Sequence, residues 1–297
     1  MRKRNIALWA LTPVAVALVL SGCGSGSDND LAVDNNAQSC SVVSSSGSAV
    51  VVGSGVAGDP AAPEAASGYR LGYKAKQSSK YMVVANTPLA TKAGCDVLKA
   101  GGTAVDAAVA VQAVLGLVEP QSSTLAGSAF MMYYDANTKK VVAYDGRETA
   151  PAAANGYYLV RQDHGDASSP APVPTARRSG RSIGVPGVMR MLDMAHKEHG
   201  KLGWDKLFDE GIQLATNGYR IPGRMGDAIK GNAASLALDA NAVAAFFNAD
   251  GTPKATGTVT TNLPYAQTLR TLASGGANAL YSGPLAEAIV AKAAQAV

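Results

Sequence analysis

Residues 104–118, AVDAAVAVQAVLGLV, are apolar on nearly every side of the helix that their composition favours. Thr103 precedes this segment and Asp106 follows three residues later, which is the arrangement of a capping box and predicts where the helix begins. A helix without a polar face has to be covered on all sides by other elements. The segment is too short and too rich in alanine to span a bilayer. The chain is therefore predicted to build layers of secondary structure around this helix.

Two elements are predicted ahead of the buried helix. Residues 81–85, YMVVA, have the composition of a short buried strand. Thr87 and Pro88 then favour the start of a helix, with the threonine as N-cap and the proline in the first helical position. Gly101-Gly102 ends that helix, because glycine readily adopts the backbone conformation found just past a helix C-terminus.

A hairpin and a mostly helical part follow. Residues 128–135 and 139–145 alternate like two paired strands, with Asn137 in the turn between them. Helices packed on a sheet that contains antiparallel strands indicate a layered α/β or α+β fold. The proline-containing segment 162–180 predicts a long surface loop, and from Gly187 onward the chain is mostly helical with glycine and proline breaks.

The N-terminus has the features of an export signal. Arg2-Lys3-Arg4 is basic, residues 6–20 form an apolar run that is short for a membrane span, and Leu-Ser-Gly-Cys ends at Cys23. This order resembles a bacterial lipobox. We therefore expect residues 1–22 to be a lipoprotein signal peptide and Cys23 to be the lipidated first residue of the mature chain. Gly24 favours sorting to the periplasmic side of the outer membrane, and an ordinary secretory peptide is the alternative.

Composition separates a linker from a folded part. Residues 23–68 contain no Phe, Tyr or Trp and are rich in small and polar residues, so we expect a disordered tether there and a folded part over 69–297.

The chain contains 26 Lys and Arg residues and 22 Asp and Glu residues, and three of the basic ones belong to the signal peptide. The mature chain is nearly neutral, which gives no electrostatic reason to expect nucleic acid as a partner.

Two further cysteines, Cys40 and Cys95, follow the lipobox. Export would permit a disulfide between them. One cysteine in a tether and one on a helix make a weak pair, so the sequence does not predict this bond and leaves the pairing open. Their spacing is not that of metal ligands.

The remaining common chemistries find little support. The chain has three histidines, His164, His196 and His199. No Gly-x-Ser-x-Gly follows a predicted strand and opens a helix, which disfavours a serine hydrolase. His196 and His199 could share one helix face and hold zinc, but no third ligand is evident, and a solvated helix C-terminus is the preferred interpretation. The Gly-Gly pairs at 101 and 275 end helices, whereas a phosphate site needs a helix start.

Arg147 is the candidate binding residue. It stands in VVAYDGRETAP, residues 141–151, where a predicted strand ends at Asp145-Gly146. A guanidinium is always charged and can fork onto a carboxylate, so an arginine at a strand end could reach into a cleft. A structural ion pair or a solvated turn would explain the same residues, and these residues alone leave both interpretations open.

Several stretches together resemble one enzyme family. They are Gly-Gly-x-Ala-Val-Asp-Ala-Ala and Val-Glu-Pro-Gln within 88–123, the hairpin, Arg-Glu-x-Ala-Pro at 147–151, Val-Pro-Gly within 183–219, and the stretch 269–290. In this order they resemble the N-terminal half of γ-glutamyltranspeptidases, and the similarity extends over residues 75–297.

The resemblance implies an α+β fold, the αββα four-layer sandwich of N-terminal-nucleophile hydrolases, incomplete in this chain. Members of that family cut themselves into a large and a small subunit. The threonine that begins the small subunit attacks the γ-glutamyl amide of compounds such as glutathione, with its own amine as base, and the acyl group passes to water, an amino acid or a peptide. By resemblance, Arg147 binds the α-carboxylate of the γ-glutamyl group and Glu148 packs or orients locally. No cofactor is expected.

Two departures from the family pattern matter. The family's Ser-Gly-x-Gly-Gly-Gly-Gly-Phe is replaced at Ser123–Phe130 by Ser-Thr-Leu-Ala-Gly-Ser-Ala-Phe, so permissive glycines are lost near the cleft and the turn has to be rebuilt. The nucleophilic threonine is expected beyond Val297, and Thr260-Thr261, which precedes a helix start, is not expected to replace it. Alone, the chain should be inactive and leave sheet edges unpaired.

Three interpretations follow. The leading one is the large-subunit portion of a lipid-anchored γ-glutamyltranspeptidase, whose partners are γ-glutamyl compounds, its own small subunit and the membrane. The second is a related acylase that acts on another acyl amide, such as a glutaryl amide. The third is a truncated, catalytically inactive lipoprotein that only binds.

Overall fold

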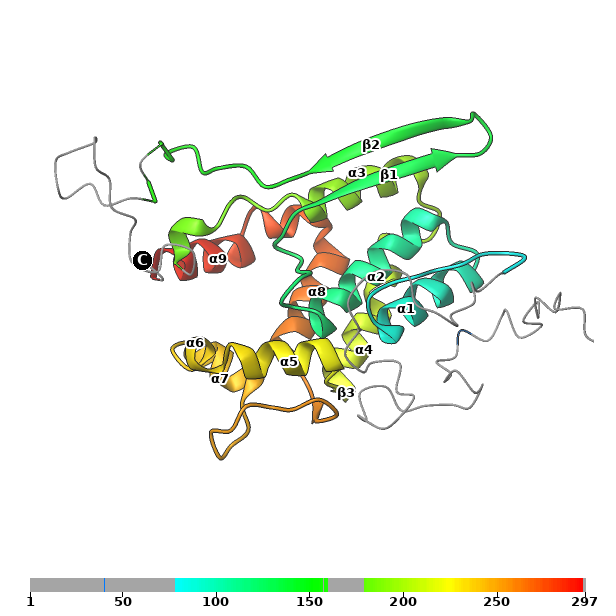
Figure 1. Cartoon of the computed structure of the whole chain (residues 1–297). Coiled ribbons are helices and arrows are strands. Elements are labelled where there is room, and N and C mark those ends of the chain that lie inside the picture. The colour runs from blue at the N-terminus through cyan, green and yellow to red at the C-terminus, as the bar shows by residue number, and fades with distance from the viewer. Residues whose placement is uncertain (1–39, 41–77, 157, 160–178, 296–297) are drawn as a thin grey trace, which may run out of the picture.

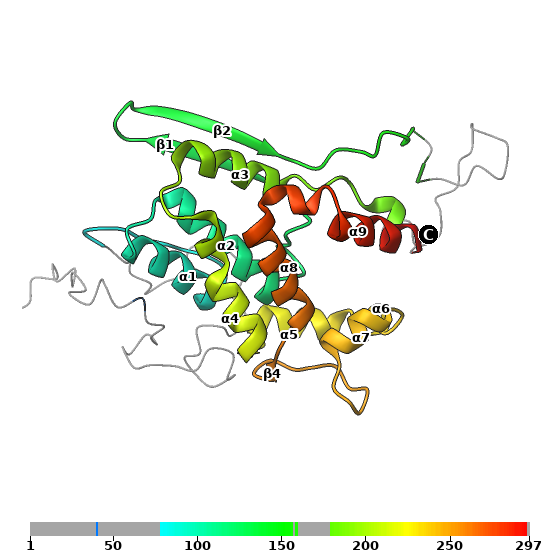
Figure 2. The same ribbon diagram turned by 180° about the vertical axis from the view of Figure 1, so that it is seen from behind.

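The computed structural model describes Cys40 and residues 78–156, 158–159 and 179–295. In these residues a long hairpin lies along one side of a group of helices (Figures 1 and 2). The first elements are α1 (Pro88–Lys99), α2 (Ala104–Val118), β1 (Ala129–Asp135), β2 (Lys140–Gly146) and α3 (Val188–His199). The others are η2 (Gly180–Ser182), η3 (Trp204–Phe208), α4 (Asp209–Asn217), β3 (Tyr219–Arg220), α5 (Gly223–Gly231), α6 (Ala233–Leu236), α7 (Ala240–Phe246), β4 (Val259–Thr260), α8 (Leu263–Gly275), η4 (Ala277–Leu280) and α9 (Pro284–Gln295).

Several predicted features lie outside the described residues. They are the signal peptide 1–22, Cys23, the tether 23–68 apart from Cys40, His164, and nearly all of the loop 162–180. In the part of the chain that the structure describes, no helix is both long and apolar enough to cross a membrane.

Helix α2 is the centre of the packing, as its composition predicts. It contacts α1, α3, α4 and η3, and its buried residues lie all around its circumference. Its first turn has the predicted capping box. The Thr103 hydroxyl accepts a hydrogen bond from the Asp106 N–H at 3.2 Å, and the Asp106 carboxylate accepts one from the Thr103 N–H at 2.8 Å. The apolar composition and the capping box therefore predict the position and the first residue of this helix correctly.

Different faces of α2 support two clusters of buried side chains. One cluster joins α2 to α3, η3 and α8, and the other joins it to α1, α4 and α5. Side chains of α2 that belong to the first are Val105, Val109 and Ala113, and those of the second are Ala110, Val114 and Leu117. Their spacing of three and four residues follows the helical repeat.

Helix α1 also begins and ends where the sequence predicts. Pro88 is its first residue, and the Thr87 hydroxyl accepts a hydrogen bond from the Ala90 N–H at 3.3 Å. Gly101, just past its end, has a φ of 87°, a conformation that favours glycine.

The buried strand expected at 81–85 is wrong. These residues have no ladder partner among the described residues, and Val84 is 84% exposed. The segment instead runs beside α1, where the Ala85 N–H donates to the Thr91 hydroxyl at 3.1 Å. A strand needs a neighbour to pair with, and β-forming composition does not supply one.

The predicted hairpin is confirmed to within one residue at each border. β1 and β2 pair in antiparallel register, with Ala129 opposite Gly146 at the open end. Asn137 lies in the turn, and its N–H donates to the Asp135 carboxylate at 2.9 Å. Lys139, at the end of this turn, has a positive φ of 56°.

The hairpin has one covered face and one open face. Helix α3 contacts both strands, and the side chains turned toward it are Met131, Tyr133 and Tyr144. The opposite face carries four large exposed apolar side chains, Phe130, Met132, Tyr134 and Val141. Since both faces of a sheet inside a layered fold are covered, this outer face is available to a further layer.

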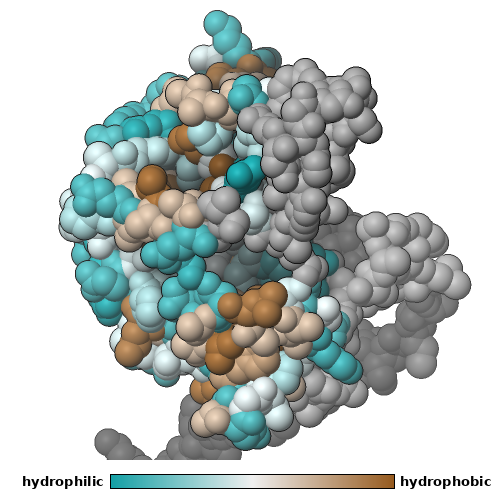
Figure 3. All heavy atoms as spheres, turned by 90° about the vertical axis from the view of Figure 1, so that its left-hand side faces the viewer, coloured by the Kyte–Doolittle hydropathy of each residue, from teal (hydrophilic) through white to brown (hydrophobic). Residues whose placement is uncertain are grey.

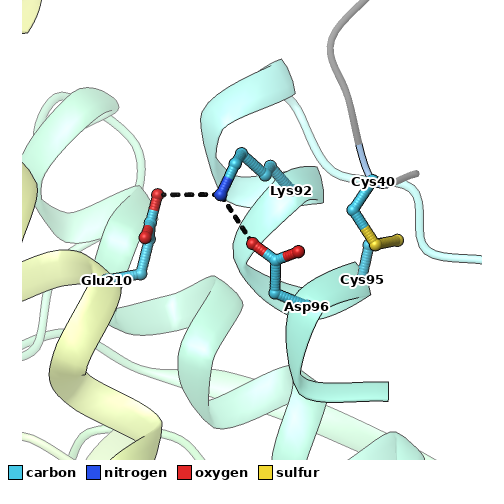
Figure 4. Close-up of a disulfide and its surroundings, with 5 residues drawn as sticks. All are labelled: Cys40, Lys92, Cys95, Asp96 and Glu210. Atoms are coloured by element: carbon cyan, nitrogen blue, oxygen red, sulfur yellow. Dashed lines mark hydrogen bonds and ion pairs between the residues drawn. A yellow bond between two sulfur atoms is a disulfide. The ribbon is translucent and has the colours of Figure 1, made fainter. Parts of the chain in front are cut away.

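A disulfide joins Cys40 to Cys95 on α1 (Figure 4). The sequence left this pairing open, because the bond joins residues that are 55 positions apart. On the same helix, Lys92 Nζ lies 2.6 Å from Asp96 Oδ2 and 3.4 Å from Glu210 Oε1. Helix α1 is therefore tied to Cys40 by a covalent bond and to α4 by an ion pair.

Candidate functional site

Arg147 lies directly after the last residue of β2. Its side chain is 54% exposed, and its backbone N–H donates to the Asp145 carboxylate at 2.9 Å. One terminal guanidinium nitrogen, Nη2, donates to Glu148 Oε1 at 2.7 Å. The structure therefore gives Arg147 an ion pair with its neighbour and leaves the guanidinium accessible, so the carboxylate-binding role remains a prediction.

The backbone around Arg147 is fixed by a close approach of two glycines. A Cβ on Gly187 would lie 2.3 Å from the Gly146 carbonyl oxygen and 2.7 Å from that of Arg147. A Cβ on Gly146 would lie 2.7 Å from the Met191 Cβ. The strand end that carries Arg147 can thus rest directly on the start of α3 only because both positions lack a side chain.

The first turn of α3 is capped by protein groups. The Gly187 and Val188 N–H groups donate to the Gly127 carbonyl at 3.0 and 3.2 Å. The Arg190 N–H donates to the Tyr281 hydroxyl at 3.2 Å. Since helix N-termini have orphan N–H groups, these contacts satisfy three of them and attach the segment before β1 to α3.

Glu148 stands between two groups that favour its charged form. The nearby Ser128 hydroxyl lowers the pKa of the Glu148 carboxyl below its usual value, and the Glu148 backbone N–H and the Arg147 charge act in the same direction. Ser128 comes just before β1 and Arg147 just after β2, so the pairing of Ala129 with Gly146 brings them together. The strand pairing therefore places Ser128 near the Arg147–Glu148 ion pair.

The altered segment Ser123–Phe130 is well anchored. The Gln112 amide nitrogen donates to the Ser123 hydroxyl at 3.2 Å and to the Thr124 carbonyl at 3.0 Å. Leu125 is buried in the core cluster that includes α3. The rebuilt turn is therefore held in place by hydrogen bonds from the Gln112 side chain and by the burial of Leu125.

Glu119 is a buried charged residue that the sequence interpretation did not single out. It is fully buried at the end of α2, and its Oε2 accepts hydrogen bonds from Gln121 at 2.7 Å, Ser122 at 3.1 Å and Arg224 Nε at 3.1 Å. Its carbonyl also accepts from the Ser122 and Ser123 N–H groups. The available signal was a glutamate that directly follows an all-apolar helix, where a charge needs a partner.

The two histidines of α3 have structural surroundings. His196 is only 15% exposed, and its Nε2 lies 3.3 Å from Asp106 Oδ1 and 3.0 Å from the Leu202 carbonyl oxygen. His199 stacks on Tyr133 with ring centroids 4.0 Å apart. The helix ends at His199 as predicted, but the expected solvation of this pair is wrong, because neighbouring elements cover most of both rings. The described residues contain no group of three or more metal-ligating side chains.

Two other places differ from the Arg147 region. Thr260 is buried in β4, and its hydroxyl accepts a hydrogen bond from Lys254 at 2.8 Å. A pocket of ≈ 440 Å³ lies between the Pro120-Gln121 bend and helices α5–α7, and apolar residues such as Met225, Ile229 and Phe246 form much of its wall. Arg147 is not among the residues that line this pocket.

Comparison with known proteins gives one consistent result. The family described as gamma-glutamyltranspeptidase matches residues 90–296. The glutathione hydrolase proenzyme of Bacillus subtilis (strain 168) is 34% identical over 210 residues, which are 70% of this chain and 34% of that protein. Glutathione hydrolase 3 of Arabidopsis thaliana is 34% identical over 214 residues, 72% of this chain and 32% of that protein. The chain therefore spans about a third of the length of these curated relatives.

Solved structures agree with the sequence relatives. The γ-glutamyltranspeptidase of Helicobacter pylori superposes with a TM-score of 0.67 at 29% identity and covers 73% of this chain and 60% of that one. The transpeptidase CapD of Bacillus anthracis superposes with a TM-score of 0.59 at 28% identity, over 73% and 66% of the two chains. A cephalosporin acylase from Bacillus halodurans has a TM-score of 0.57 at 25% identity, over 68% and 37%.

Proposed function

The chain belongs to the γ-glutamyltranspeptidase family, and we propose that it is the large-subunit portion of an enzyme that cleaves γ-glutamyl amides, such as that of glutathione. Its α+β fold is part of the αββα four-layer sandwich of N-terminal-nucleophile hydrolases. The names of two relatives, glutathione hydrolases from a bacterium and a plant, support this substrate class.

The observation that carries the proposal is Arg147 at the end of β2. A γ-glutamyl group has a free α-carboxylate, and an arginine can bind a carboxylate through two parallel hydrogen bonds. The Arg147 side chain is more than half exposed, while its backbone is fixed between Gly146 and Gly187. A charged group on a fixed backbone can hold the substrate by a group that does not react and so place the γ-amide.

The proposed chemistry is acyl transfer to a threonine expected beyond Val297. The threonine hydroxyl attacks the γ-carbonyl carbon, its own α-amine takes the hydroxyl proton, and that proton passes to the departing amine as the amide bond breaks. Water, an amino acid or a peptide then attacks the acyl-enzyme and releases the threonine. In this scheme Arg147 binds the substrate and takes no part in proton transfer.

We propose the C-terminal, small-subunit portion as the partner that completes the site. The outer face of the hairpin exposes Phe130 (67%), Met132 (69%) and two further large apolar side chains. Apolar residues are also exposed near α7 and on α9, among them Leu238, Val243 and Val290, and the face in Figure 3 shows apolar groups with hydrophilic residues between them. Helix α3 covers only the other face of the hairpin, so a further layer would remove these apolar side chains from water.

Export and lipid anchoring belong to the proposal. The order of basic residues, apolar run and Cys23 supports a lipoprotein that is held on the periplasmic side of the outer membrane. The disulfide between Cys40 and Cys95 fits an oxidising compartment.

The decisive experiment uses the protein isolated from its own cells, with intact masses and N-terminal residues determined for every chain. A second chain that begins with threonine, together with turnover of a γ-glutamyl anilide, is expected. A single lipidated chain without turnover would leave a binding lipoprotein. Turnover of a glutaryl anilide in preference to the γ-glutamyl one would favour the acylase, an alternative that the altered Ser123–Phe130 segment and the Bacillus halodurans structure keep in view.

A further inference from the structure

We propose that Asp145 is a positioning residue for substrate binding, because its carboxylate holds the backbone of Arg147. Oδ1 of Asp145 accepts a hydrogen bond from the Arg147 N–H at 2.9 Å. This inference rests on the proposed function, in which Arg147 binds a substrate carboxylate. It gives a role in binding to an aspartate whose own side chain need not touch the substrate.

The Arg147 N–H lies in a gap between two stretches of strand pairing. The ladder of β1 and β2 ends at Gly146, and the next backbone pairing is the isolated bridge of Thr149 with Val185. In that bridge the Thr149 N–H donates to the Val185 carbonyl at 3.3 Å, and the Val185 N–H donates to the Thr149 carbonyl at 2.8 Å. Within the gap, the Asp145 carboxylate is the acceptor for the Arg147 N–H.

This contact sets the direction in which the guanidinium leaves the chain. Because the peptide unit is planar, a hydrogen bond to the Arg147 N–H orients the whole unit before Arg147 and so the start of its side chain. On the other side, a Cβ on Gly187 would lie 2.7 Å from the Arg147 carbonyl oxygen. The backbone of Arg147 is thus restrained from both sides, while its side chain is 54% exposed. A restrained backbone reduces the freedom that the arginine must lose when it binds substrate, which is preorganisation.

Asp145 acts on the backbone of Arg147 and not on its charge. The guanidinium makes its ion pair with Glu148, where Nη2 lies 2.7 Å from Oε1, and no ion pair joins it to Asp145 in the described part of the chain. Aspartate and asparagine side chains can both accept a hydrogen bond from the N–H two residues further on, which is the Asx turn. A glutamate has one more methylene, which moves its oxygens away from that N–H. The position of the acceptor oxygen is therefore what matters here.

The far end of the hairpin has a matched contact. There Oδ1 of Asp135 accepts a hydrogen bond from the Asn137 N–H, also at 2.9 Å and also two residues further on. The two contacts have the same spacing and length, but only that of Asp145 lies at Arg147. A general weakening of the hairpin should follow from the loss of either contact, whereas weaker substrate binding should follow only from the loss of the Asp145 contact.

The test uses the native two-chain enzyme with a γ-glutamyl anilide and the variants Asp145→Ala, Asp145→Asn and Asp145→Glu. Asp145→Ala should raise KM about 3- to 10-fold, the equivalent of one hydrogen bond, and leave kcat within about 2-fold. Asp145→Asn should keep the wild-type KM, because its amide oxygen can accept the same hydrogen bond. Asp145→Glu keeps the charge but should behave like Asp145→Ala. The control Asp135→Ala should leave both constants unchanged.

Hydrogen exchange tests the contact without turnover. In enzyme that contains nitrogen-15 arginine, the Arg147 amide should exchange faster in Asp145→Ala and Asp145→Glu than in the wild type, and it should exchange at the wild-type rate in Asp145→Asn. Urea unfolding checks that each variant is folded. If Asp145→Ala does not fold, the contrast between Asp145→Asn and Asp145→Glu decides, because these two variants differ in the contact and not in the removal of a polar side chain.

The outcomes distinguish this inference from the function beneath it. A wild-type KM or a wild-type exchange rate of the Arg147 amide in folded Asp145→Ala, while Arg147→Ala loses activity, would overturn the role of Asp145 alone. A raised KM in Asp145→Asn with a wild-type KM in Asp145→Glu would do the same, since the charge would then matter instead of the backbone contact. Unaltered kcat/KM in Arg147→Ala would overturn the carboxylate-binding function itself, whatever the Asp145 variants do.

Discussion

Nε2 of His196 lies 3.3 Å from Oδ1 of Asp106, and this contact joins the last turn of α3 to the first turn of α2. The Asp106 carboxylate is completely buried and also accepts hydrogen bonds from the Lys201 and Leu202 N–H groups, in addition to the capping contact with Thr103. The Gly-Gly-x-Ala-Val-Asp element of the sequence therefore contains a structural carboxylate that organises three segments of the chain.

Replacement of Asp106 should be among the most destabilising changes in the described part of the chain. Asp106→Ala removes a helix cap and leaves the partly buried N–H groups of Lys201 and Leu202 without this acceptor, for a loss of about 3 kcal/mol in the free energy of unfolding. Urea unfolding measures this loss. The control Asp96→Ala removes an exposed carboxylate paired with Lys92 and should cost about 1 kcal/mol or less. Equal midpoints for the two variants would contradict the role of Asp106.

Gly187→Ala should damage the site more than its size suggests. The new Cβ would meet the carbonyl oxygens of Gly146 and Arg147, so the strand end has to move away from α3. We expect a loss of about 1–3 kcal/mol in stability and a fall of about 10- to 100-fold in kcat/KM, because Arg147 is displaced. Gly231→Ala is the control, since a Cβ there meets nothing within 4 Å. Similar kinetics in both variants would show that the glycine contact does not position Arg147.

The disulfide should stabilise the folded chain through the loop that it closes. Cys40 and Cys95 are 55 residues apart, for which chain entropy gives about 4 kcal/mol. A reductant should therefore lower the urea midpoint of the wild type to that of Cys40→Ser/Cys95→Ser, and it should leave the double variant unchanged. A wild type whose midpoint does not respond to the reductant, with the bond shown to be reduced by thiol labelling, would refute this prediction.

The contact between the hairpin and α3 should weaken at alkaline pH through Tyr144. Its hydroxyl donates to Glu198 Oε2 at 2.6 Å, and burial, followed by this contact with a carboxylate, raises the pKa of Tyr144 from 10.0 to about 12. The folded state thus prefers the neutral phenol. This contribution to stability is complete below pH 10 and is lost as the pH rises from 10 to 12. The unfolding free energy of the wild type should fall more steeply than that of Tyr144→Phe over this range, and parallel curves would exclude the effect.

The helices around α2 could be predicted because their signals are local. Thr87-Pro88, and Thr103 with Asp106, mark helix starts through contacts within one turn of the chain, and the structure shows those contacts. The hairpin was equally accessible, because its alternation and its turn are neighbours in sequence. Local agreement of this kind is what makes a sequence specify one fold.

The features that could not be predicted depend on distant partners. The strand expected at 81–85 needs a neighbour, and the bond of Cys40 needs the path of the chain back to α1. The place of His196 near a helix end favoured a solvated ring, but the ring is largely covered because it contacts Asp106 and the Leu202 carbonyl after α3. For the site, family resemblance predicts Arg147, whereas its glycine support depends on the close approach of Gly187 to Gly146, which are far apart in the sequence.

Arg147→Ala in the native enzyme is the most direct test of the binding role. Loss of one partner of a hydrogen-bonded charge pair typically costs about 2–5 kcal/mol, and we expect kcat/KM for a γ-glutamyl anilide to fall accordingly. Arg147→Lys keeps the charge but loses the planar fork, so it should recover only part of this loss. Arg220→Ala is a matched control, because that arginine is exposed, lies on the separate β3–β4 pair and donates to the Gly257 carbonyl. A fall shared by both alanine variants would point to a general charge effect, whereas a fall confined to Arg147 would place the substrate carboxylate at the end of β2.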